Sequence, residues 1–187
     1  MGKEALLKTK DGEVTCSVCG RNLTKYGSKT LADGILCRNC AKLVSGWYTS
    51  GDLAERTVEQ VKEHLDYRQN NLAVIKAFNG LKVVEGKYSL FVDDTKRQFV
   101  ISKRDDLVKE NADVFSLSMI ENMRIIEKRY KTKSGSDIMV EILVKHPQFR
   151  SLRFQVNEFG CLERDSAEFR LALQLAYKYI NAFKKRK

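Results

Sequence analysis

Two pairs of cysteines near the start of the chain constrain its fold more than any other feature. Cys16 and Cys19 form one C-x-x-C pair, Cys37 and Cys40 form a second, and seventeen residues lie between the pairs. Tetrahedral Zn²⁺ binds four thiolates at about 2.3 Å, and two C-x-x-C turns at this separation are typical of a zinc site. The sequence therefore predicts one zinc ion held by Cys16, Cys19, Cys37 and Cys40.

The residues between the two pairs are expected to bring them together. Gly20 directly follows the first pair, where the backbone turn favours a residue that tolerates positive φ. Residues 31–36 place Asp33 and Gly34 between apolar residues, which is a strong hairpin signal. A short helix can begin after Cys40. Turn, hairpin, turn and helix in this order predict a treble-clef-like zinc ribbon.

The main alternative for these cysteines is a pair of disulfides. In the first 15 residues, no charged start is followed by the apolar segment of a secretory signal. We therefore expect a cytoplasmic protein. Because disulfides are rare in the reducing cytoplasm, we expect its cysteines to bind zinc as thiolates. Because all four expected ligands are cysteines, no coordination position is left for water. The metal is therefore expected to be structural and not catalytic.

The net charge of +10 is compatible with an anionic partner. Four of these charges lie in the last four residues, Lys184–Lys187, which we expect to be a frayed tail. Residues 1–50 contribute eight basic and four acidic side chains, a further +4. Zinc thiolates are themselves anionic, so basic residues near them often only compensate charge. Nucleic-acid binding through the zinc module and the tail is therefore an alternative hypothesis.

A polar helix is expected after the zinc module. Residues 57–60 have the form of a capping box, and apolar residues then recur at helical spacing without Gly or Pro over residues 57–78. The polar side of this helix predicts a solvent-exposed connector, with His64 in solvent. Trp47 and Tyr48 are expected to pack on the zinc module, which has few large apolar residues of its own.

From Gly80 the apolar pattern changes from helical to alternating, which is typical of antiparallel strands with one buried face. The first segment reads as one long strand or as a bent pair that turns at Gly86. Residues 133–136 predict a hairpin turn. The predicted strands cover residues 82–93, 98–103, 115–119, 122–131, 137–145 and 152–157.

An amphipathic helix is expected to close the chain. Asp165 begins a second capping box, and the apolar residues that follow recur at i, i+3, i+4, i+7, i+8 and i+11. Such a stripe must be buried, and the inner faces of the preceding strands are the surface available. The stripe consists of Phe169, Ala172, Leu173, Ala176, Tyr177 and Ile180.

This order of elements resembles an uncharacterised family of bacterial and phage proteins with a four-cysteine zinc domain, a linking helix and a pleckstrin-homology-like domain. The resemblance rests on residues 16–20 and 29–43, the latter matching K-x-L-x-D-G-x-x-C-x-x-C, with a weaker echo at residues 75–79. It implies zinc binding by the four cysteines and no catalytic activity. It also implies an α+β fold, in which an antiparallel β-sandwich or barrel is closed by the C-terminal helix. We expect a zinc ribbon over residues 1–50, a linking helix over 51–79 and a pleckstrin-homology-like domain over 80–187.

No residue pattern in the chain indicates catalysis. The fifth cysteine, Cys161, has no histidine motif near it, and we expect a small buried residue at a turn. Nucleotide-binding and hydrolase motifs are not found in the sequence. We therefore expect a protein that is not an enzyme.

Basic residues crowd the predicted hairpin at residues 124–133. They could meet an acidic protein or an anionic membrane, but Glu127, Asp137 and Glu141 are expected to pair with them across the strands. Our first hypothesis is an interaction or adaptor protein that binds another protein, including its own copy. A nucleic-acid-binding regulator and a peripheral anionic-membrane binder are the alternatives.

Overall fold

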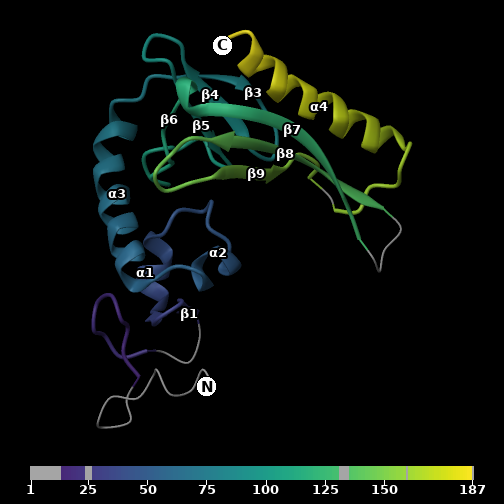
Figure 1. The fold of residues 1–187 in the computed structure, drawn as a ribbon. Helices are drawn as coiled ribbons and strands as arrows, with labels where there is room; N and C mark the ends of the chain where they lie inside the picture. The colour runs from purple at the N-terminus through teal and green to yellow at the C-terminus, as the bar shows by residue number, and fades with distance from the viewer. Residues whose placement is uncertain (1–13, 24–26, 131–134, 159, 187) are drawn as a thin grey trace. The chain divides into compact units, whose positions relative to one another are not determined.

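The computed structural model describes residues 14–23, 27–130, 135–158 and 160–186. The chain divides into two compact units, residues 1–72 and 73–187. The elements of both are labelled in Figure 1. The fold is mixed, with antiparallel sheets, helices and a C-terminal helix, as the sequence predicts. Among the described residues, no helix has the length and apolar character needed to cross a membrane.

The first unit contains the predicted hairpin. Strands β1 (Lys29–Thr30) and β2 (Ile35–Leu36) pair antiparallel, and the N–H of Leu31 donates to the carbonyl of Gly34 at 2.8 Å across the turn. The hairpin is therefore confirmed. Helices α1 (Arg38–Leu43), α2 (Ser50–Ala54) and α3 (Val58–Lys76) follow. The capping box of α3 is also confirmed, because Thr57 and Gln60 exchange hydrogen bonds of 3.1 and 3.3 Å.

The prediction that His64 lies in solvent is wrong. His64 is fully buried, and its Nε2 accepts the N–H of Ser45 at 3.1 Å. Its ring lies between Tyr48 and Tyr67, at centroid distances of 4.5 and 5.7 Å. The first turns of α3 therefore help to close the core of the first unit, into which Tyr48 also packs, as expected. The polar His64 side chain can be buried here because it has a hydrogen-bond partner. The spacing of apolar residues in the sequence does not reveal such partners.

The second unit contains two antiparallel sheets (Figure 1). A four-stranded sheet has the order β3-β4-β5-β6, and a three-stranded sheet has the order β7-β8-β9. Of the two readings of residues 82–93, the bent pair is correct, and Gly86 lies in the turn between β3 and β4. Residues 131–134 of the predicted hairpin turn lie outside the described residues. The strands are β3 (Leu81–Val84), β4 (Ser89–Asp93), β5 (Gln98–Ser102), β6 (Phe115–Ser116), β7 (Ile120–Arg129), β8 (Ser136–Val144) and β9 (Ser151–Gln155), with a 3-10 turn, η1 (Leu117–Met119), between β6 and β7.

Helix α4 (Ala167–Lys184) buries one face against the strands of this unit, as predicted (Figure 1). Two details differ from the prediction. The N-cap is Ser166, whose hydroxyl accepts the N–H of Phe169 at 3.1 Å, because Asp165 has a positive φ of 68°. Tyr177 is exposed, whereas Tyr179 and Phe183 are buried, each in an edge-to-face contact with an aromatic residue of the sheets.

The end of the chain is more ordered than the predicted frayed tail. Arg186 donates to the Asp94 carboxylate at 2.6 Å, and Arg97 donates to the carbonyl of Arg186 at 2.9 Å. Lys187 lies outside the described residues. Cys161 is half-buried where full burial was expected, and its N–H donates to Asp137 at 2.9 Å.

Candidate metal centre

The four predicted ligands lie together in the first unit. Their Sγ atoms all lie within 4.8 Å of one another. Two thiolates on a tetrahedral zinc ion with bonds of about 2.3 Å are about 3.8 Å apart. The Sγ atoms of Cys19 and Cys37, which come from different pairs, are 3.7 Å apart. This spacing fits a shared tetrahedral ion, and it is far longer than the disulfide bond length of about 2.05 Å.

Backbone hydrogen bonds fix the first knuckle, which carries Cys16 and Cys19. The N–H of Gly20 donates to the carbonyl of Cys16 at 2.8 Å, and Gly20 adopts a φ of 71° that favours glycine. Ser17 then attaches the knuckle to β2. Its N–H donates to the carbonyl of Ile35 at 2.8 Å, and its Oγ accepts the N–H of Ile35 at 3.0 Å.

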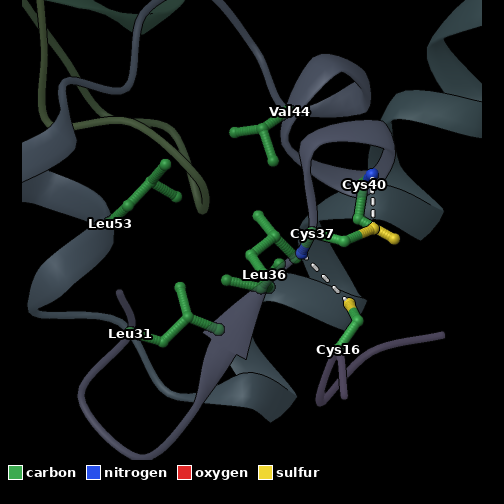
Figure 2. Packing of buried hydrophobic residues seen from close by; sticks show 8 residues of the cluster. Cys16, Leu31, Leu36, Cys37, Cys40, Val44 and Leu53 are labelled. Atoms are coloured by element: carbon green, nitrogen blue, oxygen red, sulfur yellow. Dashed lines mark hydrogen bonds between the residues drawn. The ribbon is translucent and has the colours of Figure 1, made fainter. Parts of the chain in front are cut away.

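The second pair is positioned by the start of helix α1. Cys37 is the N-cap residue of α1, and Cys40 lies in its first turn. Figure 2 shows the two N–H···S contacts that result. The N–H of Cys37 donates to the Sγ of Cys16 at 3.3 Å, and the N–H of Cys40 donates to the Sγ of Cys37 at 3.4 Å. Thiolates are thus stabilised by backbone donors as well as by any bound cation.

The electrostatics of the cluster favour a divalent cation. Burial opposes ionisation of Cys16, but backbone donors from Cys37, Cys19 and Val18 outweigh it and lower the pKa of the Cys16 thiol to about 6. Burial raises the pKa of Cys40, and its contacts with the neighbouring cysteine side chains raise it further. Several adjacent thiols do not all ionise without a compensating positive charge. A bound metal ion supplies that charge, so the donor set fits Zn²⁺.

An apolar core supports the cysteines from one side. Leu36 is fully buried and lies between the cysteines and the aliphatic side chains of Leu31, Leu53 and Val44 (Figure 2). Cys16, Cys37 and Cys40 are buried, whereas Cys19 is exposed. A metal ion can therefore enter from the side of Cys19. Among the described residues, the cluster contains no His, Asp or Glu, so its donor set is that of a structural site.

One residue that supports the module was missed by the sequence patterns. His64 receives the N–H of Ser45, two residues beyond the end of α1. It lies three residues after Val61, which is also buried, and this i, i+3 relation was the available signal. Next to it, the Nε of Arg68 donates to the carbonyl of Leu43 at 3.3 Å. Helix α3 therefore supplies partners for the backbone at the C-terminal end of α1, the helix that carries Cys40.

In a comparison with protein families, residues 15–64 match one family model. That model is described as a domain of unknown function (DUF4428). The matched segment contains the four cysteines and ends at His64, so it covers the cysteine cluster and the helix turn that closes its core. Comparison with curated proteins and with solved structures found no match.

Proposed function

We propose that the protein is a non-enzymatic adaptor held together by structural zinc. A zinc ribbon of the treble-clef type over residues 1–50 is joined by a linking helix over 51–79 to a pleckstrin-homology-like domain over 80–187. The observation that carries the proposal is the cluster of four cysteine sulfurs within 4.8 Å, which offers a metal no open coordination position. Such a site stabilises a fold and leaves function to the protein surface.

The architecture of the second unit supports the pleckstrin-homology-like part of the proposal. A four-stranded antiparallel sheet is followed by a three-stranded one and then by a single amphipathic helix that packs on both. This order matches the expectation from the resemblance. Fold does not define a ligand, so the choice of a partner rests on the charged side chains.

Ion pairs favour a protein partner over a polyanion. Arg186 of the tail is bonded to Asp94, and Arg129 of the basic hairpin lies 3.2 Å from Glu127. Lys131 and Lys133 of that hairpin lie outside the described residues. A polyanion binds through several phosphates at once and so needs several free basic side chains, whereas Arg129 and Arg186 are already paired. We therefore rank nucleic acid and anionic membrane below a protein, and we place the protein in the cytoplasm, where thiolates stay reduced.

Metal analysis tests the zinc site. Purified, unchelated protein is expected to contain one equivalent of zinc, measured by elemental analysis, and chelation is expected to unfold the first unit. The double variant Cys37→Ser/Cys40→Ser removes one pair and should lose the metal. Cys161→Ser is the matched control and should keep it, because Cys161 is not part of the cluster. Wild-type protein without zinc, or a double variant that retains it, would contradict the zinc ribbon.

Salt dependence tests the class of partner. If the adaptor proposal is correct, DNA and RNA should bind weakly, with no preference that survives physiological salt. Tight binding that falls steeply with salt would instead support the nucleic-acid regulator, because phosphate contacts release counterions. Sedimentation with anionic and neutral liposomes tests the membrane alternative in the same way.

A further inference from the structure

The outer face of the three-stranded sheet carries a buried carboxylate between two exposed arginines. Glu141 lies in the central strand β8, directly opposite Arg124 of β7 and Arg153 of β9. The Glu141 side chain is fully buried, whereas those of Arg124 and Arg153 are 59% and 58% exposed. We call these three side chains the arginine row.

Each arginine uses only part of its hydrogen-bonding capacity on Glu141. Arg124 donates from Nε to one carboxylate oxygen, and Arg153 donates from Nε to the other. A guanidinium has five N–H donors in a fixed plane. Within the described part of the chain, neither guanidinium donates to any other group, so the terminal Nη groups of both remain available. Because both arginines donate to the same carboxylate, from the strands on either side of it, the two guanidiniums flank one point of this face.

The acidic residues of this face are buried and its basic residues are exposed. Asp137, in the same strand as Glu141, accepts the hydroxyl of Tyr130 and the N–H of Cys161, and it is 5% exposed. Lys128, which faces Asp137 across the strands, is exposed. An approaching molecule therefore meets positive charge first, although the positive and negative charges of the cross-strand pairs nearly cancel.

Apolar side chains surround the arginine row. The register of the sheet places Ile126 and Met139 on one side of it and Leu143 on the other, on the same outer face. All three are half-buried. Apolar contacts beside a few fixed polar groups are typical of surfaces that recognise peptides and proteins, whereas a nucleic-acid surface is mostly polar.

Fold stability alone does not account for a buried carboxylate in this place. Replacing a buried Arg–Glu–Arg triad by apolar residues is often neutral or stabilising. Glu141 does, however, hold the two flexible arginine side chains in one geometry. Binding of a ligand then costs less conformational entropy, because these side chains are already ordered. The carboxylate is thus better explained as a positioning group for the two arginines.

We propose that the arginine row, with Ile126, Met139 and Leu143 beside it, binds an acidic segment of a partner protein. A carboxylate of that segment would accept hydrogen bonds from the Nη groups of Arg124 and Arg153, and apolar residues on either side of it would contact the apolar side chains. This inference rests on the proposed adaptor function and names its binding surface. A second copy of the chain fits less well if the same face meets itself, because that would bring two arginine rows together.

Titration with a synthetic peptide tests this assignment. The probe is a short peptide with one Glu between two Leu residues, and its partner peptide has Gln in place of Glu. Isotope-labelled, zinc-loaded full chain should show shifts of the Nε–H signals of Arg124 and Arg153 on addition of the Glu peptide. The Gln peptide should bind about tenfold more weakly, because a hydrogen bond to a charged carboxylate is stronger than one to a neutral amide.

Three variants separate specific binding from general charge attraction. Arg153→Lys keeps the charge but loses the planar fork, and it should weaken binding of the Glu peptide about tenfold. The triple variant R124Q/E141M/R153Q removes the buried charge together with its partners, so it should stay folded and lose binding. Arg104→Gln is the control, since Arg104 pairs with Glu110 at 2.9 Å in a loop beyond β5. It should bind as the wild type does.

The inference is overturned if the folded protein ignores the Glu peptide or if Arg104→Gln loses as much affinity as Arg153→Lys. Row-dependent binding to anionic vesicles without peptide binding, or a dimer that the triple variant abolishes, would also overturn it. Zinc content is measured on the same samples. Failure of peptide binding with one equivalent of zinc present refutes the binding surface and leaves the zinc ribbon standing, whereas absence of zinc refutes the ribbon whatever the peptide does.

Discussion

The substitution Leu36→Ala should weaken zinc binding, although a leucine side chain has no donor atom and cannot coordinate the metal. Leu36 is 0% exposed at the centre of the core that supports the cysteines. Leu→Ala substitutions at such sites cost about 3–5 kcal/mol, from lost transfer free energy and the remaining cavity. In a small metal-dependent module, the free energies of folding and metal binding are coupled. A loss of about 3 kcal/mol therefore lowers the apparent zinc affinity about hundredfold.

Competition with a chromophoric chelator measures this effect. Leu43→Ala is the matched control, because Leu43 lies in the same module, in helix α1, and is 59% exposed. Its apparent zinc affinity should stay within about twofold of the wild type, as expected for a surface substitution. Equal affinities for Leu36→Ala and the wild type would refute the coupling, and equal losses in both leucine variants would refute the role of burial.

Two further predictions concern stability. Gly34→Ala should destabilise the first unit by about 1–3 kcal/mol in chemical denaturation, because the new Cβ would lie 2.5 Å from the Oγ of Ser17. Gly46→Ala, where nothing lies within 4 Å, should have almost no effect, and equal effects would argue against the steric reason. Burial opposes ionisation of Glu141, but hydrogen bonds from its two arginines outweigh it and lower its pKa. Since the folded pKa is the lower one, this stabilisation is present above about pH 4.3 and is lost as the pH falls through the folded value. R124Q/E141M/R153Q should therefore lose less stability than the wild type between pH 5 and pH 3, measured by thermal unfolding, and identical pH profiles would contradict this.

Local patterns predicted the features that depend on neighbouring residues. The spacing of Cys16 to Cys40 and the Asp33-Gly34 turn lie within one short segment, and the structure brings these cysteines together as the pattern indicates. The alternation of residues 137–145 likewise predicted a strand, and β8 lies there. Each of these signals needs only the chain geometry of a few residues.

Features that depend on distant partners were not predicted. His64 reads as a polar helix residue, and only the folded chain offers it the N–H of Ser45. The buried face of α4 shifts toward Tyr179 and Phe183 because Phe154 and Phe99 lie opposite them. Cross-strand pairing of Glu141 was expected in general. Its position between two arginines required the register of three strands, which no local pattern contains.

The short range of the first unit's contacts has a consequence for synthesis of the protein. Among the described residues, the hydrophobic cluster of its core runs from Cys16 to Val61 and is closed by His64. The unit ends at residue 72, before the first strand of the second unit. Structures built from nearby residues form faster than those that need long-range strand pairing, and domains fold in order as they leave the ribosome. The first unit can thus bring its four cysteines together while most of the second is still untranslated. On the proposal that this unit binds zinc, a limited zinc supply would act on the nascent chain before the strands of the second unit exist.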